Sequence, residues 1–433
     1  MQYGFFNSFI NFCRNGVRRN RNFVWSNGRR IADWNFCSGI CSFALYGGSY
    51  RSKKCCRISN NDFNFTISPS RNFWTKRENI LRISTKFLMT IFLTAGSIYL
   101  VFILNEEGPL RILFNLLTFA GIYGLAAIGL NVHFGLTGLL NFGHASFMGV
   151  GAYVTLLLIP HAAGREGEIT DTGLTFFPAL VIGIIAAALF GLLLGLPAIR
   201  LRGDYLAIVT IAAAEIFRLL VRDLESVTGG VYGIINFSES LQIYKPEFLI
   251  NFSERFELNS SQMWVGLLSW ISIFIVLILL RRLTNSPWGR ALRAVREDED
   301  AVRALGKNAI WLKLQSFMLG AGIAGLAGVF LAFNYGSLQT TTFVPLLTFY
   351  VWAIMILGGV GSLTGPIFGS IIFWVIISET DRLAQLIFEN ANGQQLAGVR
   401  FILVGLLIML LMIFRPSGLL GKKEELLLDV KSS

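Results

Sequence analysis

The sequence predicts an all-α, polytopic membrane protein with about ten spans, and three observations support this. Of its 433 residues, 54% are hydrophobic and only 15% are charged, whereas soluble domains average about 25% charged residues. Apolar runs of about 20 residues recur, and each is long enough to cross roughly 30 Å of hydrocarbon. The strands of a membrane barrel would alternate over about ten residues, and the chain shows no such alternation.

Ten apolar segments are expected to form helices. The third, fifth and ninth are the weakest, because they are short, interrupted by glycine or charged. Irregular backbone at membrane depth is tolerated only inside protein or beside a water-filled cavity, so these three are candidates for broken or re-entrant segments. The ten segments are 86–104, 111–132, 143–159, 174–196, 205–221, 263–280, 314–333, 344–360, 365–378 and 397–414.

Loop charge predicts the orientation of the spans, because cytoplasmic loops carry an excess of Lys and Arg. The 281–313 loop has eight basic residues, and basic residues also occur in the 197–204 loop and in the tail at 422–433. With ten spans these three regions share one side, predicted to be cytoplasmic, so both ends of the membrane domain at 86–421 face inward. The predicted location is the inner (plasma) membrane. The loops expected on the outer side are 105–110, 160–173, 222–262 and 379–396.

Residues 1–85 form a distinct region. They hold 14 Lys/Arg and 3 Asp/Glu, which equals the whole +11 charge of the chain, so the remainder is neutral and gives no indication of nucleic-acid binding. The preferred interpretation is a disordered or non-native extension. An organelle transit peptide and a metal site are the alternatives. All five cysteines lie in this region, at Cys13, Cys37, Cys41, Cys55 and Cys56.

A charged segment lies between two apolar runs and has the boundaries of a helix. Ser286 suits an N-cap and Pro287 the first turn, while Gly306 suits a C-terminal stop. A narrow apolar stripe and three i,i+4 ion pairs are expected on this single helix. The stripe is Ala291, Leu292, Val295, Val302 and Leu305, and the pairs are Arg293–Glu297, Arg296–Asp300 and Glu299–Arg303.

Two interpretations of this helix stay open. It is either a solvated connector or a coupling helix whose exposed face docks on a cytoplasmic ATPase. The residues expected to carry the coupling are Gly289, Arg290, Arg293, Arg296, Glu297, Asp298 and Glu299.

Polar residues within apolar segments are candidates for a substrate path. Asn141 and His144 end a glycine-rich passage, where a helix start would offer N–H groups to a carboxylate; a hydrogen-bonded packing role is the alternative. Glu215 and Arg218 lie three residues apart on one helix face, where charges usually face the bundle interior. They are either a self-neutralising pair, part of the path, or residues near the membrane edge.

Glycine-rich motifs predict turns and close helix packing. One motif follows the fifth span on the predicted outer side and contains Thr228, Gly229, Gly230 and Gly233. It is interpreted as an outer gate, as a seat for a binding protein, or as a simple turn. Small residues recur every fourth position, which lets helix backbones approach within one subunit or between subunits. These small-residue stripes contain Gly320 and Gly328, and Gly361, Gly365 and Gly369. A second glycine-rich passage, at 358–365, is a candidate counterpart of the one at 135–144 in two structural halves.

No catalytic constellation accompanies these features. The chain lacks a phosphate-binding loop, a zinc-protease motif and a nucleophile elbow. Its three histidines, His133, His144 and His161, are not at metal-binding spacing. We therefore expect a transport protein rather than an enzyme, with no cofactor or metal of its own. Any uphill transport would draw on an ion gradient or on another polypeptide.

Several motifs resemble one membrane-protein family. The run 289–299 resembles the cytoplasmic loop of permease subunits of ABC importers for branched-chain amino acids, of the LivM type. Further motifs match in the expected order across 86–421, and the match does not include 1–85. They are Leu140–Tyr153, Arg202–Thr210, Thr228–Gly233, Leu357–Pro366 and Arg415–Gly421.

The resemblance implies a heteromeric importer. Its other parts would be a second permease subunit, two cytoplasmic ATPase subunits that hold ATP and Mg²⁺, and a periplasmic binding protein, all associated with membrane lipid. The substrate would be a branched-chain or another neutral amino acid. An importer of urea or amides, and a secondary amino acid transporter coupled to ions through Glu215, are the alternatives.

Overall fold

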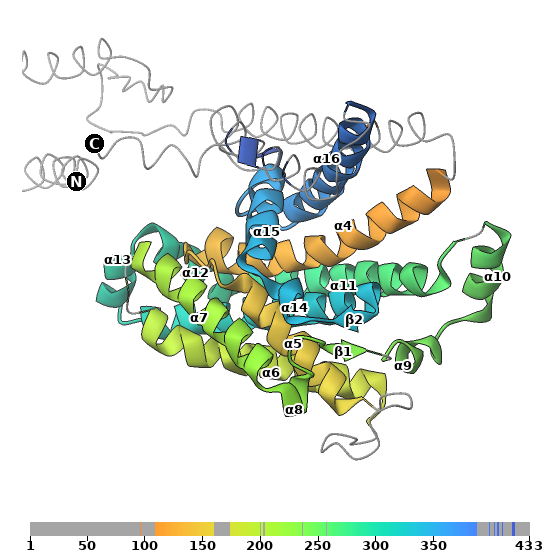
Figure 1. Cartoon of the computed structure of the whole chain (residues 1–433). Coiled ribbons are helices and arrows are strands. Elements are labelled where there is room, and N and C mark those ends of the chain that lie inside the picture. The colour runs from red at the N-terminus through yellow and green to blue at the C-terminus, as the bar shows by residue number, and fades with distance from the viewer. Residues whose placement is uncertain are drawn as a thin grey trace, which may run out of the picture. The chain divides into compact units, whose positions relative to one another are not determined.

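A computed structural model shows the protein as a bundle of helices (Figure 1). Every described residue belongs to the unit that begins at Asn79. The segments expected at 86–104 and 397–414, the whole region 1–85 with its cysteines, His161 and the tail at 422–433 lie essentially or wholly outside the described residues. The structure describes 109–159, 174–387 without 200, 202, 203, 236 and 257, and 418–420, together with the single positions 96, 398, 402, 405, 406 and 409.

Eight of the ten expected segments are helices in this structure, which confirms the all-α class. They are α4 (Pro109–Asn131), α5 (His144–Leu158), α6 (Phe176–Ala198), α7 (Asp204–Asp223), α11 (Ser260–Asn285), α14 (Ala309–Tyr335), α15 (Pro345–Gly358) and α16 (Gly365–Ile387). Among the described residues, four stretches are long and apolar enough to cross a membrane, namely Leu110–Leu136, Phe176–Pro197, Ser260–Asn285 and Ala309–Tyr335.

The remaining four helices are α5, α7, α15 and α16, and three of them, α5, α7 and α16, are the segments that the sequence marked as weakest. The helices α5, α15 and the apolar part of α16 are shorter than a full span. The segment at 205–221 is nevertheless one continuous helix despite its charges. The segment at 365–378 runs on to Ile387 and is therefore longer than expected.

The centre of the bundle is built on α14 and α4. The helix α14 packs against α4, α5 and α6, and α4 packs against α11, α15 and α16. Glycines make these contacts close: a side chain at Gly320 would collide with Gly129 of α4, and one at Gly328 would collide with Met148 of α5. The stripe on α14 therefore serves packing within this chain, which is one of the two expected roles.

The second small-residue stripe is only partly helical. Gly365 and Gly369 lie on α16 and pack closely on the end of α15, at Gly358 and Ile354. Gly361 has a φ of 77° in the turn before α16. The expectation of one continuous stripe through Gly361 is therefore wrong, because the left-handed backbone places this glycine in a turn.

Both glycine-rich passages break the helices as predicted, and they meet in space. The helix α4 continues into a π-helical turn, η1 (Val132–Leu136), before the loop to α5. The Asn131 side chain accepts a hydrogen bond from Gly361 N (2.9 Å) and donates one to Ser362 O (2.9 Å). Residues 418–420 contact the end of α15, where Leu419 N donates a hydrogen bond to Leu357 O at 2.9 Å.

Short elements gather at two opposite ends of the described bundle (Figure 1). At one, which we call the α12 end, lie α12 (Pro287–Glu297), α13 (Glu299–Ala304), η1 and the turn from α6 to α7. The other, the β end, has an antiparallel pair of strands in which Ile234 pairs with Leu338 and Ile235 with Ser337. It comprises α8 (Glu225–Thr228), β1 (Ile234–Ile235), α9 (Glu239–Gln242), α10 (Glu247–Arg255), β2 (Ser337–Leu338) and the 3-10 turn η2 (Thr340–Phe343).

Candidate functional site

The charged segment at the α12 end forms two helices, so the prediction of a single helix over 286–306 is wrong. The break is at Asp298, whose backbone is extended (φ −156°, ψ 104°) and whose carboxylate accepts a hydrogen bond from Ala301 N at 3.0 Å. Aspartate is a strong N-cap, so Asp298 ends α12 and starts α13. Pro287 begins α12 and Gly306, at φ 77°, follows the end of α13, as predicted.

Ser286 occupies the N-cap position of α12 without capping it. Its hydroxyl instead donates to Leu283 O at 2.6 Å, in the last turn of α11. The first turn of α12 is held by Trp288, whose Nε1 donates to the Gln315 side chain of α14 at 2.8 Å. This segment is therefore fixed against α11 and α14 rather than being a loose connector.

The apolar stripe faces the bundle, with one exception. Ala291, Leu292, Val295 and Val302 are buried. Leu305 is 80% exposed, so its inclusion in the stripe was wrong. The break at Asp298 changes the direction of the chain between the two helices, and an i,i+3/i+4 pattern counted through it no longer follows one face.

The charged residues on these helices divide into an outward and an inward set. Arg290, Arg293, Glu297 and Asp298 are exposed, whereas Arg296 and Glu299 are half-buried and Gly289 is buried against Thr284. The guanidinium of Arg293 donates to the carbonyl oxygens of Thr284 (3.1 Å) and Gly289 (3.4 Å). In the part of the chain that is described, the expected Arg293–Glu297 pair does not form.

Glu299 is held by two cations. Its carboxylate pairs with Arg303 at 2.6 Å, as expected, and also with Lys313 of α14. Burial raises the pKa of the Glu299 carboxyl, but Lys313 and Arg303 outweigh burial, so its pKa lies below the ordinary value. The other expected pair, Arg296–Asp300, would require one continuous helix, and Arg296 instead turns inward.

Arg296 reaches η1. Its Nη1 donates to Gly135 O at 2.7 Å, a contact between residues 161 positions apart in the sequence. The helix α14 contacts the same turn: Ser316 Oγ donates to Val132 O at 2.9 Å, and His133 Nε2 hydrogen-bonds Phe317 O at 2.9 Å. Sequence reasoning missed this network. Its local signals were polar residues, among them His133 and Ser316, within largely apolar segments.

A cavity of about 570 Å³ opens beside this network. It is bounded by the chain after η1, the start of α7, both helices of the charged segment and the start of α14. Its charged lining residues are Arg296, Glu299, Asp300, Arg303 and Lys313. The α12 end therefore presents a polar hollow surrounded by residues of the segment that the sequence singled out.

Asn141 and His144 are fully buried. Asn141 Nδ2 hydrogen-bonds His133 Nδ1 at 3.0 Å, and its Oδ1 accepts from Gly143 N at 2.9 Å. His144 Nε2 hydrogen-bonds Ala126 O at 3.0 Å. In this conformation both have the hydrogen-bonded packing role that was the alternative, and their burial gives no support to a substrate path.

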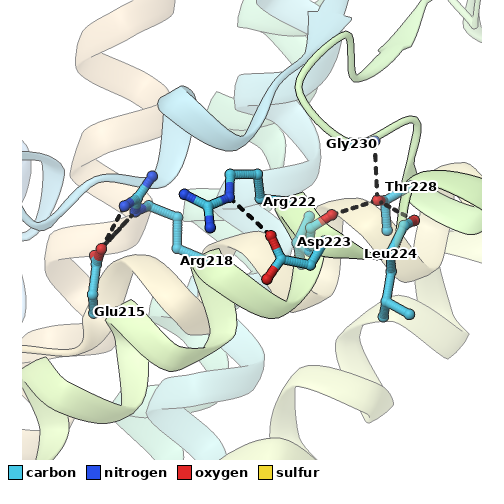
Figure 2. Close-up of polar contacts among 8 residues, drawn as sticks. Glu215, Arg218, Arg222, Asp223, Leu224, Thr228 and Gly230 are labelled. Carbon is cyan, nitrogen blue, oxygen red and sulfur yellow. Dashed lines mark hydrogen bonds and ion pairs between the residues drawn. The ribbon is translucent and has the colours of Figure 1, made fainter.

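Glu215 and Arg218 pair with each other on α7 (Figure 2). Arg218 Nε lies 3.1 Å from Oε1 and 3.0 Å from Oε2 of Glu215, so both carboxylate oxygens are engaged. The Glu215 side chain is 39% exposed. This geometry matches the self-neutralising pair. Among the described residues, no hydrogen bond or ion pair connects it with Asn141 or His144.

The Thr228 motif is a tight turn at the β end. Thr228 Oγ1 lies 2.5 Å from Val221 O and 2.8 Å from Leu224 O, and it accepts a hydrogen bond from Gly230 N at 3.3 Å (Figure 2). Gly229, Gly230 and Gly233 have positive φ values of 74°, 57° and 71°, which only glycine adopts readily. The turn leads into β1; whether it also acts as a gate or a seat stays a prediction.

These features define the class of protein: a polytopic helical membrane protein with broken spans and a charged helix pair between two long apolar helices. A family model described as "Branched-chain amino acid transport system / permease component" matches residues 112–414. The chain belongs to this family of permease components.

Relatives from bacteria and archaea support this assignment. The chain is 33% identical over 317 residues to the high-affinity branched-chain amino acid transport system permease protein LivM of Salmonella typhimurium, covering 71% of this chain and 69% of that protein. It is 28% identical to the probable LivM of Methanocaldococcus jannaschii, covering 71% and 93%. It is 27% identical to LivH of Escherichia coli, covering 73% and 96%. No solved structure gives a significant match.

Proposed function

We propose that this chain is one permease subunit of an ATP-driven importer of branched-chain amino acids. The observation that carries the proposal is the pair α12 and α13, which stands between two long apolar helices, buries an apolar underside and exposes Arg290, Arg293 and Glu297. Family membership and the LivM and LivH relatives support the substrate class.

The proposed complex has parts that this chain does not supply. A second permease subunit pairs with this one in the inner membrane, and a periplasmic protein delivers the amino acid at the β end. Two ATPase subunits, which hold ATP and Mg²⁺, dock on the exposed face of α12, so the α12 end is cytoplasmic. The excess of basic residues in the 281–313 loop supports this orientation.

In the proposed cycle, nucleotide-driven closure of the ATPases moves α12, and the bundle alternates between outward and inward access. The chain acts as a gate and supplies no catalytic group of its own. Coupling to ions through Glu215 is less well supported, because both oxygens of that carboxylate are engaged by Arg218.

The test is uptake by the complete complex reconstituted in liposomes. We expect ATP-dependent uptake of labelled leucine, isoleucine or valine that requires the binding protein. Reversing both exposed charges, Arg293→Glu with Glu297→Arg, should lower ATP-coupled uptake by about tenfold, because this face would no longer match its docking groove. Assembly should survive, since neither side chain is buried.

Three results would contradict this proposal. Uptake of urea in place of leucine would overturn the substrate class. Uptake that persists without ATPase subunits and collapses with the ion gradient would identify a secondary transporter. Unchanged coupling in the double charge reversal would show that the face of α12 is not the docking surface.

A further inference from the structure

The turn η1 is an unusual point in the bundle because its backbone departs from the α-helix. Single π-helical turns inside α-helices are rare and occur frequently at functional sites. Here η1 follows α4 without a break and leads into the glycine-rich loop to α5. Helix ends leave carbonyl groups without helical partners, and such groups must find partners elsewhere when they are buried.

The carbonyls of His133 and Phe134 find partners in the chain that follows, at Leu139 and Gly138, whereas two further carbonyls find partners in other elements. Arg296 of α12 donates to Gly135 O, and Ser316 of α14 donates to Val132 O. Asn131, the residue just before η1, holds the turn between α15 and α16 through Gly361 and Ser362. Together, Asn131 and η1 are thus bonded to the charged segment, to the central helix and to the second broken passage.

Gly135 is necessary for this arrangement. A Cβ atom at Gly135 would collide with the Asn131 side chain and lie 2.9 Å from Gly361 N. The close approach leaves the Gly135 carbonyl turned to Arg296 while its α-carbon faces the turn before α16. A push on Arg296 therefore acts on a backbone that is continuous with α4 and lies against the turn before α16.

The bond from Arg296 differs in kind from the apolar contacts of α12. The apolar underside of α12 is held by non-directional packing, which allows sliding. A guanidinium–carbonyl hydrogen bond of 2.7 Å is directional and charge-assisted. Arg296 is half-buried beside the cavity at the α12 end, so water weakens this bond less than it would at an exposed position.

We propose that Arg296 is a positioning residue for transport, which transmits movement of α12 into the bundle by holding the carbonyl of Gly135 in η1. This inference rests on the proposed function, in which α12 is the element that the ATPases move. This role is distinct from docking, because Arg296 contacts the helix bundle, while Arg293 and Glu297 are exposed.

The experiment compares variants in the full reconstituted complex, with leucine uptake and ATP hydrolysis measured on the same liposomes. Arg296→Ala should lower leucine taken up per ATP hydrolysed by roughly tenfold, which is the range for losing a hydrogen bond to a charged group. Arg296→Lys keeps a donor of shorter reach and should recover part of that ratio. Ser316→Ala removes one of the two hydrogen bonds between η1 and α14 and should also lower the ratio.

Arg281→Ala is the matched control. It removes the same charge from the same loop, and Arg281 is an exposed residue at the end of α11. The ratio should stay at the wild-type value in this variant. A purely structural role of Arg296 would lower assembly or yield of the complex, but it would leave uptake per ATP unchanged in the complexes that do assemble.

The outcomes separate the two proposals. If wild-type complex shows no ATP-dependent leucine uptake, the proposed function fails. If wild-type complex transports and Arg296→Ala keeps the wild-type ratio, the positioning role fails while the proposed function stands. If Arg296→Ala does not assemble, wild-type ratios in both Arg296→Lys and Ser316→Ala would equally overturn the positioning role.

Discussion

The four described helices that are apolar enough to cross a membrane form two pairs with opposite surroundings. In α14 and α4, 89% and 67% of the most apolar stretch is buried inside the chain, whereas the values for α6 and α11 are 28% and 39%. All four stretches are apolar enough to cross a membrane. Hydrophobicity alone therefore does not distinguish a helix at the centre of the bundle from one at its edge.

Buried polar residues distinguish α6 from the central pair. The central pair carries buried polar side chains, and two of them, Asn131 on α4 and Ser316 on α14, are hydrogen-bonded to other elements. By contrast α6 contains no polar side chain, and it exposes Val181, Ile185 and Leu193. A buried polar group needs an internal partner in the absence of water, so it marks a helix face that neighbouring helices cover. The apolar exposed face of α6 fits lipid.

Truncating one leucine in each region should give the largest contrast. Leu331 on α14 is fully buried, whereas Leu193 on α6 is 64% exposed. Leu331→Ala should lower the free energy of unfolding by about 2–5 kcal/mol through lost burial and a cavity. Leu193→Ala should change it by less than about 0.5 kcal/mol, as expected at an exposed position. Denaturant titration of the purified protein in detergent measures both. Equal losses would refute the division into central and edge helices.

Two glycines on α14 sharpen the comparison within one helix. A Cβ at Gly328 would collide with the Met148 backbone of α5, whereas one at Gly322 would lie 3.5 Å or more from α6. We expect Gly328→Ala to cost about 1–3 kcal/mol through overpacking. Gly322→Ala should be neutral or stabilising by about 0.5–1 kcal/mol, because alanine favours the helix. Melting temperatures of the two variants compare them; destabilisation by Gly322→Ala as large as that by Gly328→Ala would contradict the packing described here.

Much of this architecture could be predicted from local sequence. Apolar length located the helices, and glycine runs located both breaks, because at Gly138, Gly359 and Gly361 the backbone enters a region that other residues avoid. The charged segment was also placed correctly between two long helices, with Pro287 at its start. These features depend on neighbours in the chain, so a single sequence contains the necessary information.

The contacts between distant residues could not be predicted in this way. The break at Asp298 was hidden by good helical charge spacing on both sides, although aspartate is a typical cap. Arg296 resembled its neighbours Arg290 and Arg293 in the sequence, and only the fold brings Gly135 to it. Likewise the sequence left both a path and a packing role open for Asn141 and His144, and the structure shows them hydrogen-bonded within the core. Burial of a polar residue depends on what packs over it.

The ion pairs of Glu299 offer the smallest expected effect, at the boundary between the central helices and water. Because Lys313 and Arg303 hold the pKa of Glu299 below its ordinary value of 4.5, the charged carboxylate stabilises the fold above that pH. The contribution is lost as the pH falls from 4.5 through the lower folded pKa. Glu299→Gln should therefore cost about 1 kcal/mol at neutral pH, and the difference from wild type should disappear in acid.

Asp300→Asn is the matched control for Glu299, because Asp300 lies 3.9 Å from the same Arg303 but is 89% exposed. This neighbouring change should leave stability at neutral pH unaltered, since water screens an exposed pair. Melting curves of both variants between pH 3 and pH 7 make the comparison. A Glu299→Gln deficit that stays constant across this range would show that Glu299 stabilises the protein by packing and not by charge.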